Sequence, residues 1–511
     1  MHDFYGFIKK HKVATIIAAA LVINICACML SAGFDSAYWA AMVRNIRSGS
    51  GLYSVDGYYY TPVWGYLLGI SDALATSLVD LGNYLVVVPQ AIGIKVDPFC
   101  FTAETTKPLF NLIVKTTLVA GNFILAYLVY CIVGELGYSK ENAFKSAALV
   151  MLCPIAIVGS CFIGMPDIYS AVFIAGTILM MLREKYFLAG VFFSISVLTK
   201  FFPVFLIFIL LAYIAAKYRD DRTACIRNAT KSIVGALIAT LVIYAPVIKE
   251  GMFFESFRFL SDRAASMESM ISSHAPLIIC ALAAIAAVIA LLIYIRNKKH
   301  IHFINCMNLV LIGTVAAVAA VTVLYIAGGS IISASRVAFY VFLVFMSIVS
   351  GIVMYRNREG DFDRRFIALC FLMMIFCMLY PPTPQYVVIL VPFIALMIGM
   401  NNEKCMKGYV AVSIGVFLFV LVANGPLLMS LAQWTNLISV DTVMNIHHAF
   451  DLAIGGTTLH HLLYLLTGII QYCAILVLLW FGLINNKNEI GFPEMIGEIK
   501  NDKPAFLKRS D

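Results

Sequence analysis

Asp35 is the first of several charged side chains that follow or precede apolar segments, and it is the candidate catalytic residue of this sequence. It lies within residues 33–39 (GFDSAYW), directly after the first apolar run. A carboxylate at a membrane surface can accept the proton of an attacking hydroxyl group, which accelerates a reaction by about 10²–10⁴-fold. The alternative interpretation is an exposed loop aspartate that caps a short surface helix.

Other polar and aromatic side chains could bind a substrate at the same membrane level. A reaction that releases an anion needs fixed cations near the leaving group. The candidate substrate-binding residues are Lys200, Asp167, Arg258, Arg263, Arg336, Tyr60, Gln385 and Tyr386.

Several of these candidates also have structural interpretations. Asp167 follows a proline and could only cap a helix, and Lys200 could be an interfacial anchor that snorkels to lipid headgroups. Arg258 and Arg263 alternate with acids and could form a solvated helix face. Tyr60 could belong to an interfacial aromatic belt.

Three further residue types indicate little chemistry of their own. Lys115 lies about 12 Å along a helix from Lys107, so it either snorkels upward or points into a cavity. The adjacent pairs His447-His448 and His460-His461 do not have the spacing of helical metal ligands, so no metal site is expected, and dependence on a divalent metal stays open. The 13 Cys residues are scattered without a CxxC pair and are expected to be small core residues.

These candidates must be positioned by membrane helices, because the composition excludes a soluble protein. The 511 residues are 62% hydrophobic and 13% charged, whereas soluble domains are about 25% charged. We predict an all-α polytopic membrane protein with about 14 transmembrane helices. The predicted spans are 12–33, 108–134, 146–164, 167–183, 186–199, 201–216, 232–248, 275–295, 303–327, 333–355, 366–380, 384–400, 408–428 and 459–482.

The predicted organisation is one membrane domain over residues 1–484 and a polar cytoplasmic tail over 485–511. The long first loop, 34–107, is expected to be extracytoplasmic. Its apolar part, 62–94, is interrupted by Asp72 and Asp80, which indicates surface-lying or re-entrant helices.

The distribution of basic residues predicts the orientation. With both termini in the cytoplasm, the inner segments contain 26 of the 36 Lys and Arg residues, as cytoplasmic loops should. Residues 186–216 must then form two short helices with a turn at Lys200, because a single helix would place the basic segment 217–231 outside. We therefore expect a plasma-membrane protein whose candidate site faces the extracytoplasmic side.

The order of short motifs resembles the GT-C superfamily of membrane glycosyltransferases, which use polyprenyl-phosphate sugars, and in particular family 87 and mannosyltransferase-like families. The resemblance covers roughly the first 220 residues. It is carried by Asp35 with residues 51–53 and 60–62, by 112–130, and by 153–203, with Pro384-Gln385-Tyr386 as a late motif. The sequence departs from the family at Asn122, where relatives often have an aspartate, and at Gly164-Met165-Pro166, where they have Gly-Gln before the acid.

The resemblance implies transfer of a hexose, with mannose favoured, from a polyprenyl-phosphate sugar to a hydroxyl group of a lipid, glycan or cell-envelope polymer. The implied partners are this donor, a glycan or glycolipid acceptor and membrane lipid, with no cofactor and no nucleic acid. Asp35 would be the base, and Lys200 the first candidate for the cation at the phosphate. The alternative is a transporter or flippase of a lipid-linked sugar. Such proteins favour ionisable groups at the membrane midplane, whereas these charges gather at one interface.

Overall fold

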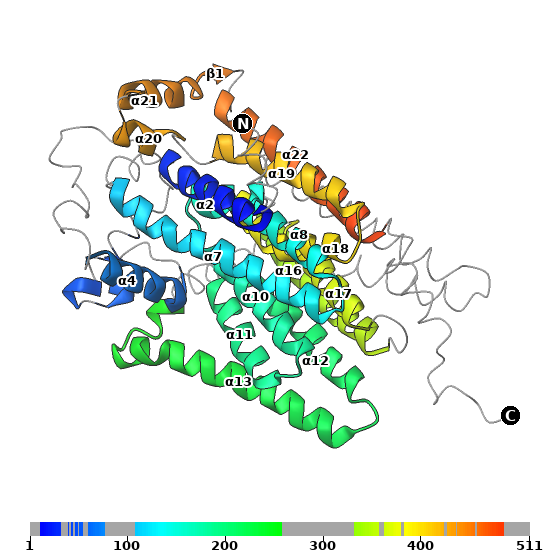
Figure 1. The fold of residues 1–511 in the computed structure, drawn as a ribbon. Coiled ribbons are helices and arrows are strands. Elements are labelled where there is room, and N and C mark those ends of the chain that lie inside the picture. Colours follow the sequence, from blue (N-terminus) through cyan, green and yellow to red (C-terminus); the bar gives the residue numbers. More distant parts are fainter. Residues whose placement is uncertain are drawn as a thin grey trace.

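The structure is a computed structural model, and apolar helices make up almost all of it. It describes residues 11–31, 39, 42–43, 46–49, 51–54, 60–76, 108–257, 332–356, 362–379, 383–423, 427–435, 437–454 and 457–484. Its long helices lie roughly side by side in a bundle (Figure 1). This arrangement is typical of membrane proteins, since helices satisfy their backbone hydrogen bonds internally.

Six helices of the described part are long and apolar enough to cross a membrane. They are α2 (Lys12–Leu30), α7 (Pro108–Glu135), the continuous segment Lys140–Phe162, α13 (Arg222–Lys249), α19 (Cys405–Ala423) and α22 (Leu459–Leu479), which continues into the π-helix η7 (Trp480–Ile484). The segment Lys140–Phe162 comprises α8 (Lys140–Met151), the short α9 (Pro154–Ala156) and the π-helix η3 (Ile157–Phe162). These helices indicate a multi-pass membrane protein.

Further apolar helices complete the bundle. They are α10 (Asp167–Leu182), α11 (Tyr186–Thr199), η4 (Phe202–Leu206) with α12 (Ile207–Lys217), α16 (Ile332–Arg356), α17 (Phe362–Cys377) and η6 (Pro384–Leu390) with α18 (Val391–Gly399). Every residue of α18, and every residue of α17 from Arg365 onward, is buried. A helix that is apolar on all sides belongs in such a core, which explains why these segments lack a polar face.

The remaining elements are small and gather at one end of the bundle, which we call the α4 end. They are η1 (Leu52–Ser54), α4 (Pro62–Thr76), η5 (Glu255–Phe257), α20 (Met429–Trp434), α21 (Val440–Ala449), β1 (Ala453–Ile454) and β2 (Thr457–Thr458). In Figure 1, α4, α20 and α21 lie at the left ends of the long helices. The antiparallel pair β1–β2 comprises only two residues per strand, so the described part of the chain has the all-α fold that the sequence predicts.

Segments predicted to lie on the inner side meet at the opposite end. Arg183 contacts Glu135 at 2.5 Å and Lys217 contacts Glu184 at 3.0 Å, so turns that are distant in sequence are joined by ion pairs. Hydrogen bonds from Lys217 and from the Tyr218 hydroxyl hold the pKa of the Glu184 carboxyl below its usual value. The structure therefore separates the two predicted sets of loops, while the compartment that each set faces stays a prediction.

Every predicted span within the described residues is largely helical, but several boundaries need correction. The span predicted at 366–380 begins at Phe362, and the span predicted at 408–428 begins at Cys405 and ends at Ala423. Two other spans begin well before their predicted starts. The span predicted at 146–164 begins at Lys140, and α13 begins at Arg222 instead of residue 232. Both helices begin with a turn or more of polar and charged residues before their apolar part. Such residues are compatible with a helix that protrudes from the membrane. The predicted spans 275–295 and 303–327, and the tail 485–511, lie outside the described residues.

Small residues allow α11 and α13 to pack with their backbones close together. A Cβ atom at Gly190 would overlap the carbonyl of Ser232, and one at Gly235 would overlap the carbonyl of Phe187. The hydroxyl groups of Ser194 and Thr240 are 2.8 Å apart at the same interface. Close contact through glycine and serine is a common way to join helices in a membrane, where the lipid is as apolar as the side chains. This packing fixes α11, whose C-terminal cap is Lys200.

Candidate functional site

A buried ion pair joins two of the predicted site residues at the α4 end. Lys200 Nζ lies 3.1 Å from Asp167 Oδ1; the aspartate side chain is fully buried and that of the lysine is 17% exposed. Lys200 caps the C-terminus of α11 in an extended conformation, and Asp167 is the first residue of α10. Two helix ends thus supply opposite charges to one point.

Two aromatic rings from distant segments flank this lysine. The Lys200 ammonium lies 4.1 Å from the centroid of the Tyr386 ring and 5.8 Å from that of Tyr60, within the range of cation–π attraction. The Tyr60 hydroxyl contacts Met165 Sδ at 3.9 Å, and the Tyr386 ring packs edge-on against Phe202. The predicted residues Asp167, Lys200, Tyr60 and Tyr386 therefore form one cluster, which we call the Lys200 cluster.

The geometry of Asp167, Lys200 and Tyr60 differs from the purely structural roles that the sequence also allows. Pro166 occupies the N-cap position of α10, so Asp167 is not its cap. Lys200 turns inward to a carboxylate instead of snorkelling to headgroups, and Tyr60 is half-buried against the protein instead of lying in an exposed belt. Asp167 also lies in the first turn of α10, where the helix dipole favours a negative charge.

The turn that delivers Asp167 depends on its local sequence. η3 is a π-helix, a form that often occurs at functional sites, and it ends just before Gly164. Gly164 has φ +81°, a conformation that side-chain-bearing residues rarely adopt. A Cβ atom there would lie 2.9 Å from Lys115 Cε. Both the backbone conformation and the lack of space require glycine.

Lys115 is completely enclosed, which differs from both sequence-based interpretations. Its ammonium donates hydrogen bonds to the backbone carbonyls of Ser31 and of Phe162, the latter at 2.7 Å. Ser31 caps the C-terminus of α2, and Phe162 is the last residue of η3. Carbonyl groups at helix C-termini carry partial negative charge, so they offset the cost of burying the cation.

Tryptophans of the first loop cover the same turn. Trp39 lies 3.6 Å from the position of a Cβ atom at Gly164, and its ring packs edge-on against Trp64 at 5.2 Å. The centroid of the Trp64 ring lies 6.4 Å from that of the Tyr169 ring in α10. Both tryptophans are 1% exposed, so these two residues of the predicted first loop are packed into the protein beside the candidate site.

A hydrogen-bonded network deeper in the bundle was not predicted from the sequence. Asn122 of α7 donates to Asn24 of α2 at 2.8 Å, and Ser160 of η3 donates to Asn122 at 3.1 Å. Asn24 also donates to the Met151 carbonyl at 3.0 Å, where α8 ends. The signal available in the sequence is an asparagine within an apolar run in each of α2 and α7.

The other candidates are not brought into the Lys200 cluster by the described part of the structure. Gln385 precedes Tyr386 in η6 and packs with its backbone near Gly159. Arg336 belongs to α16, but its side chain lies outside the described residues. Asp35, Arg258 and Arg263 also lie outside them, so their predicted roles stay predictions.

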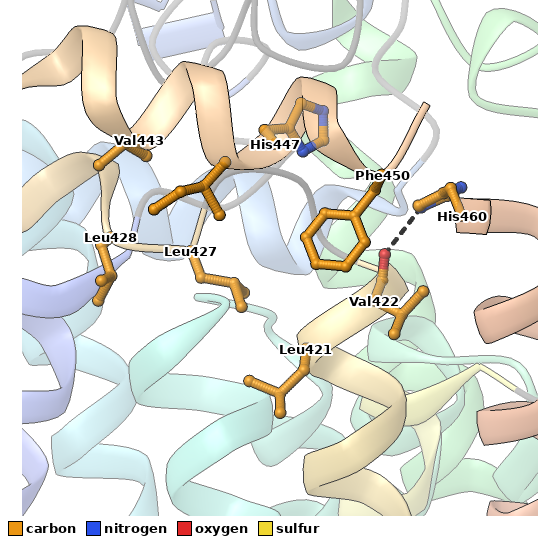
Figure 2. A pocket seen from close by; sticks show the side chains of 9 residues that line it. Leu421, Val422, Leu427, Leu428, Val443, His447, Phe450 and His460 are labelled. Carbon is orange, nitrogen blue, oxygen red and sulfur yellow. Dashed lines mark hydrogen bonds between the residues drawn. The ribbon is translucent and has the colours of Figure 1, made fainter. Parts of the chain in front are cut away.

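The histidine pairs lie beside a separate cavity of about 270 Å³ between α19, α21 and the start of α22 (Figure 2). His447 and Phe450 line it, and His460 Nε2 is 2.9 Å from the carbonyl oxygen of Val422. His448 Nδ1 lies 3.5 Å from Asp451 Oδ2. Within the described residues, His, Cys, Asp and Glu side chains form no group of three that could hold a metal.

Comparisons with known proteins give similarity to solved structures only. No protein-family model and no curated protein matches the chain. A crystal structure of the Archaeoglobus fulgidus oligosaccharyltransferase in the apo form is similar at 12% identity and a TM-score of 0.38, over 86% of this chain and 56% of that one. A second structure of that protein, tethered to an acceptor peptide containing the NVT sequon, is similar at 13% identity and a TM-score of 0.38, over 91% and 56%. The chain spans about half the length of the protein in these structures.

Proposed function

We propose that this protein is an integral membrane glycosyltransferase that moves a hexose from a polyprenyl-phosphate sugar to an acceptor hydroxyl group at the α4 end. The observation that supports the proposal is the Lys200 cluster, in which a cation is held by a buried carboxylate and two aromatic rings. Aromatic rings suit a sugar face, and a fixed ammonium suits a phosphate.

The proposed reaction is a single displacement at the anomeric carbon of the sugar. The acceptor oxygen attacks this carbon and loses its proton to the carboxylate of Asp35. The bond from the anomeric carbon to the phosphate oxygen breaks, and its electron pair leaves with the polyprenyl phosphate. Negative charge thus grows on the phosphate, where Lys200 would stabilise it.

The surroundings of Asp35 in the sequence support its assignment as the base. Ser31 and Trp39 are described residues on either side of it in the sequence; Trp39 lies at the turn that leads to Asp167, and Ser31 is joined to that turn through Lys115. Ser31 accepts a hydrogen bond from Lys115, whose stem contacts Gly164, and Trp39 packs at the same glycine. The chain therefore enters and leaves the segment that carries Asp35 beside the proposed site.

The lipid-linked donor is proposed from the setting of the Lys200 cluster. The cluster lies at the ends of the apolar helices α10 and α11, where we expect the headgroup of a lipid-linked donor to bind while its lipid tail stays in the membrane. The sequence also lacks a glycine-rich loop of the kind that cradles nucleotide phosphates. An anionic lipid headgroup is thus the donor chemistry that fits.

The test is a transfer assay with purified protein in nanodiscs. Radiolabelled polyprenyl-phosphate hexose and nucleotide-linked hexose are supplied in parallel, with a panel of lipid and glycan acceptors. We expect label to move to an acceptor from the lipid-linked donor only. Transfer from the nucleotide-linked hexose with the lipid-linked form inert would overturn the proposal. Movement of intact lipid-linked sugar across vesicle membranes without transfer would instead identify a flippase.

A further inference from the structure

Lys115 joins the two chain segments that lead to the acidic residues of the proposed site. Its ammonium bonds the carbonyl of Ser31, which ends α2 four residues before Asp35 in the sequence. It also bonds the carbonyl of Phe162, which ends η3 five residues before Asp167. The Lys115 ammonium therefore holds the C-terminal ends of α2 and η3 at fixed positions relative to α7.

The packing around Lys115 leaves it little freedom. The side chain is 1% exposed, and a Cβ atom at Gly164 would lie 2.9 Å from its Cε and 3.5 Å from its Cγ. A displaced Lys115 stem would consequently displace the turn at Gly164. Movement of this lysine and movement of the Asp167 turn are coupled through direct contact.

Lys115 is not the sole polar link between the elements that it joins. The same three elements, α2, α7 and η3, are already joined by the Asn24–Asn122–Ser160 hydrogen bonds. Asn122 lies two helical turns further along α7 from Lys115. The chain thus has two polar links between these elements, and Lys115 is the one at the level of the turn.

We infer that Lys115 is a positioning residue that sets the distance between Ser31, at the C-terminus of α2, and the turn at Gly164 that leads to Asp167. This inference rests on the proposed function for its catalytic consequence, but its structural part is independent of it. Lys115 touches neither the donor nor the acceptor in this assignment. It acts by holding two backbone carbonyls at fixed positions.

The experiment compares Lys115→Met, which keeps the stem and removes the ammonium, with Asn122→Leu as the matched control. Both variants remove polar links between the same three elements. Hydrogen exchange is measured for peptides covering residues 31–39 and 163–167, and kcat and donor KM are measured in the transfer assay. Lys115→Gln, which retains a hydrogen-bond donor, is a second variant that is used if Lys115→Met does not fold.

We expect Lys115→Met to raise exchange in both peptides by about tenfold and to lower kcat by about 10²-fold with donor KM little changed, because small misplacements of reacting groups are costly. Lys115→Gln should give intermediate values, and Asn122→Leu should change each quantity by less than about threefold. Equal effects in Lys115→Met and Asn122→Leu would reduce Lys115 to a stabilising residue and overturn the inference. Failure of both Lys115 variants to fold, with Asn122→Leu folded, would overturn it as well. If the wild type transfers no lipid-linked sugar, the proposed function fails, and the exchange comparison still decides the role of Lys115.

Discussion

The ion pair between Asp167 and Lys200 is best tested by a double-mutant cycle. The perturbations are Asp167→Asn, Lys200→Met and the combined variant, all of which approximately preserve side-chain length. At the observed N–O distance of 3.1 Å, the attraction is about 5 kcal/mol for an effective dielectric constant of about 20. Because the Lys200 side chain is 17% exposed, solvent screening weakens this attraction, and we expect a coupling energy of about 2–4 kcal/mol.

The two single variants should lose different amounts of stability, because Asp167 is more deeply buried than Lys200. Lys200→Met leaves a carboxylate that is fully buried, whereas Asp167→Asn leaves an ammonium whose side chain is 17% exposed and can reach water. Lys200→Met should therefore lower the free energy of unfolding by about 3–5 kcal/mol and Asp167→Asn by less. The combined variant should be destabilised by much less than the sum of the two.

The assay is the free energy of unfolding from SDS titration in mixed micelles, followed by circular dichroism. Additivity within about 0.5 kcal/mol would show that the two charges do not interact and would refute the pair. A larger loss in Asp167→Asn than in Lys200→Met would contradict the assignment of the carboxylate as the buried partner.

Three further predictions concern packing, pH and orientation. Gly190→Ala should destabilise the protein by about 2 kcal/mol or more, because a Cβ atom would overlap the backbone of α13, whereas Gly134→Ala, with open space, should be neutral or stabilising in a thermal unfolding assay. Glu184 has a lowered pKa in the folded protein, so its contribution to stability is present at neutral pH and is lost as the pH falls through that lowered pKa. The difference in stability between wild type and Glu184→Gln should be about 0.5 kcal/mol at pH 7 and should vanish at acid pH. In a cysteine-free background, Phe254→Cys, at an 83% exposed position of the α4 end, should react with an impermeant thiol reagent on intact cells, and Thr223→Cys should not. The reverse labelling pattern would invert the orientation.

Much of the helical architecture follows from the sequence because hydropathy alone identifies long apolar segments. The turn at Lys200 was predicted from charge, since only two short helices keep the basic residues on one side. The start of α13 at Arg222 was missed because basic residues suggested a loop, although a helix can extend out of the membrane. Charge indicates which side a segment faces better than it indicates where a helix begins.

The sequence predicts which residues form the candidate site better than it predicts which residues contact one another there. Asp167, Lys200, Tyr60 and Tyr386 were expected at one membrane level, yet nothing in the sequence specifies which helices are neighbours. The position of Lys115 could not be predicted, because its partners are backbone carbonyls of Ser31 and Phe162, which every residue type offers. The close contact at Gly190 could not be predicted either. A glycine in an apolar helix does not by itself indicate which helix packs against it.

The claim that glycosyl transfer takes place at the α4 end, with Asp35 as its base, is tested most directly by one rate measurement. Purified wild type and Asp35→Asn are compared for transfer from a polyprenyl-phosphate hexose at saturating donor and acceptor. The amide keeps the shape of the side chain and removes its basicity, so the rate should fall by about two orders of magnitude or more, while folding is unchanged. A rate in Asp35→Asn close to that of the wild type would contradict this role and leave Asp35 as a helix cap.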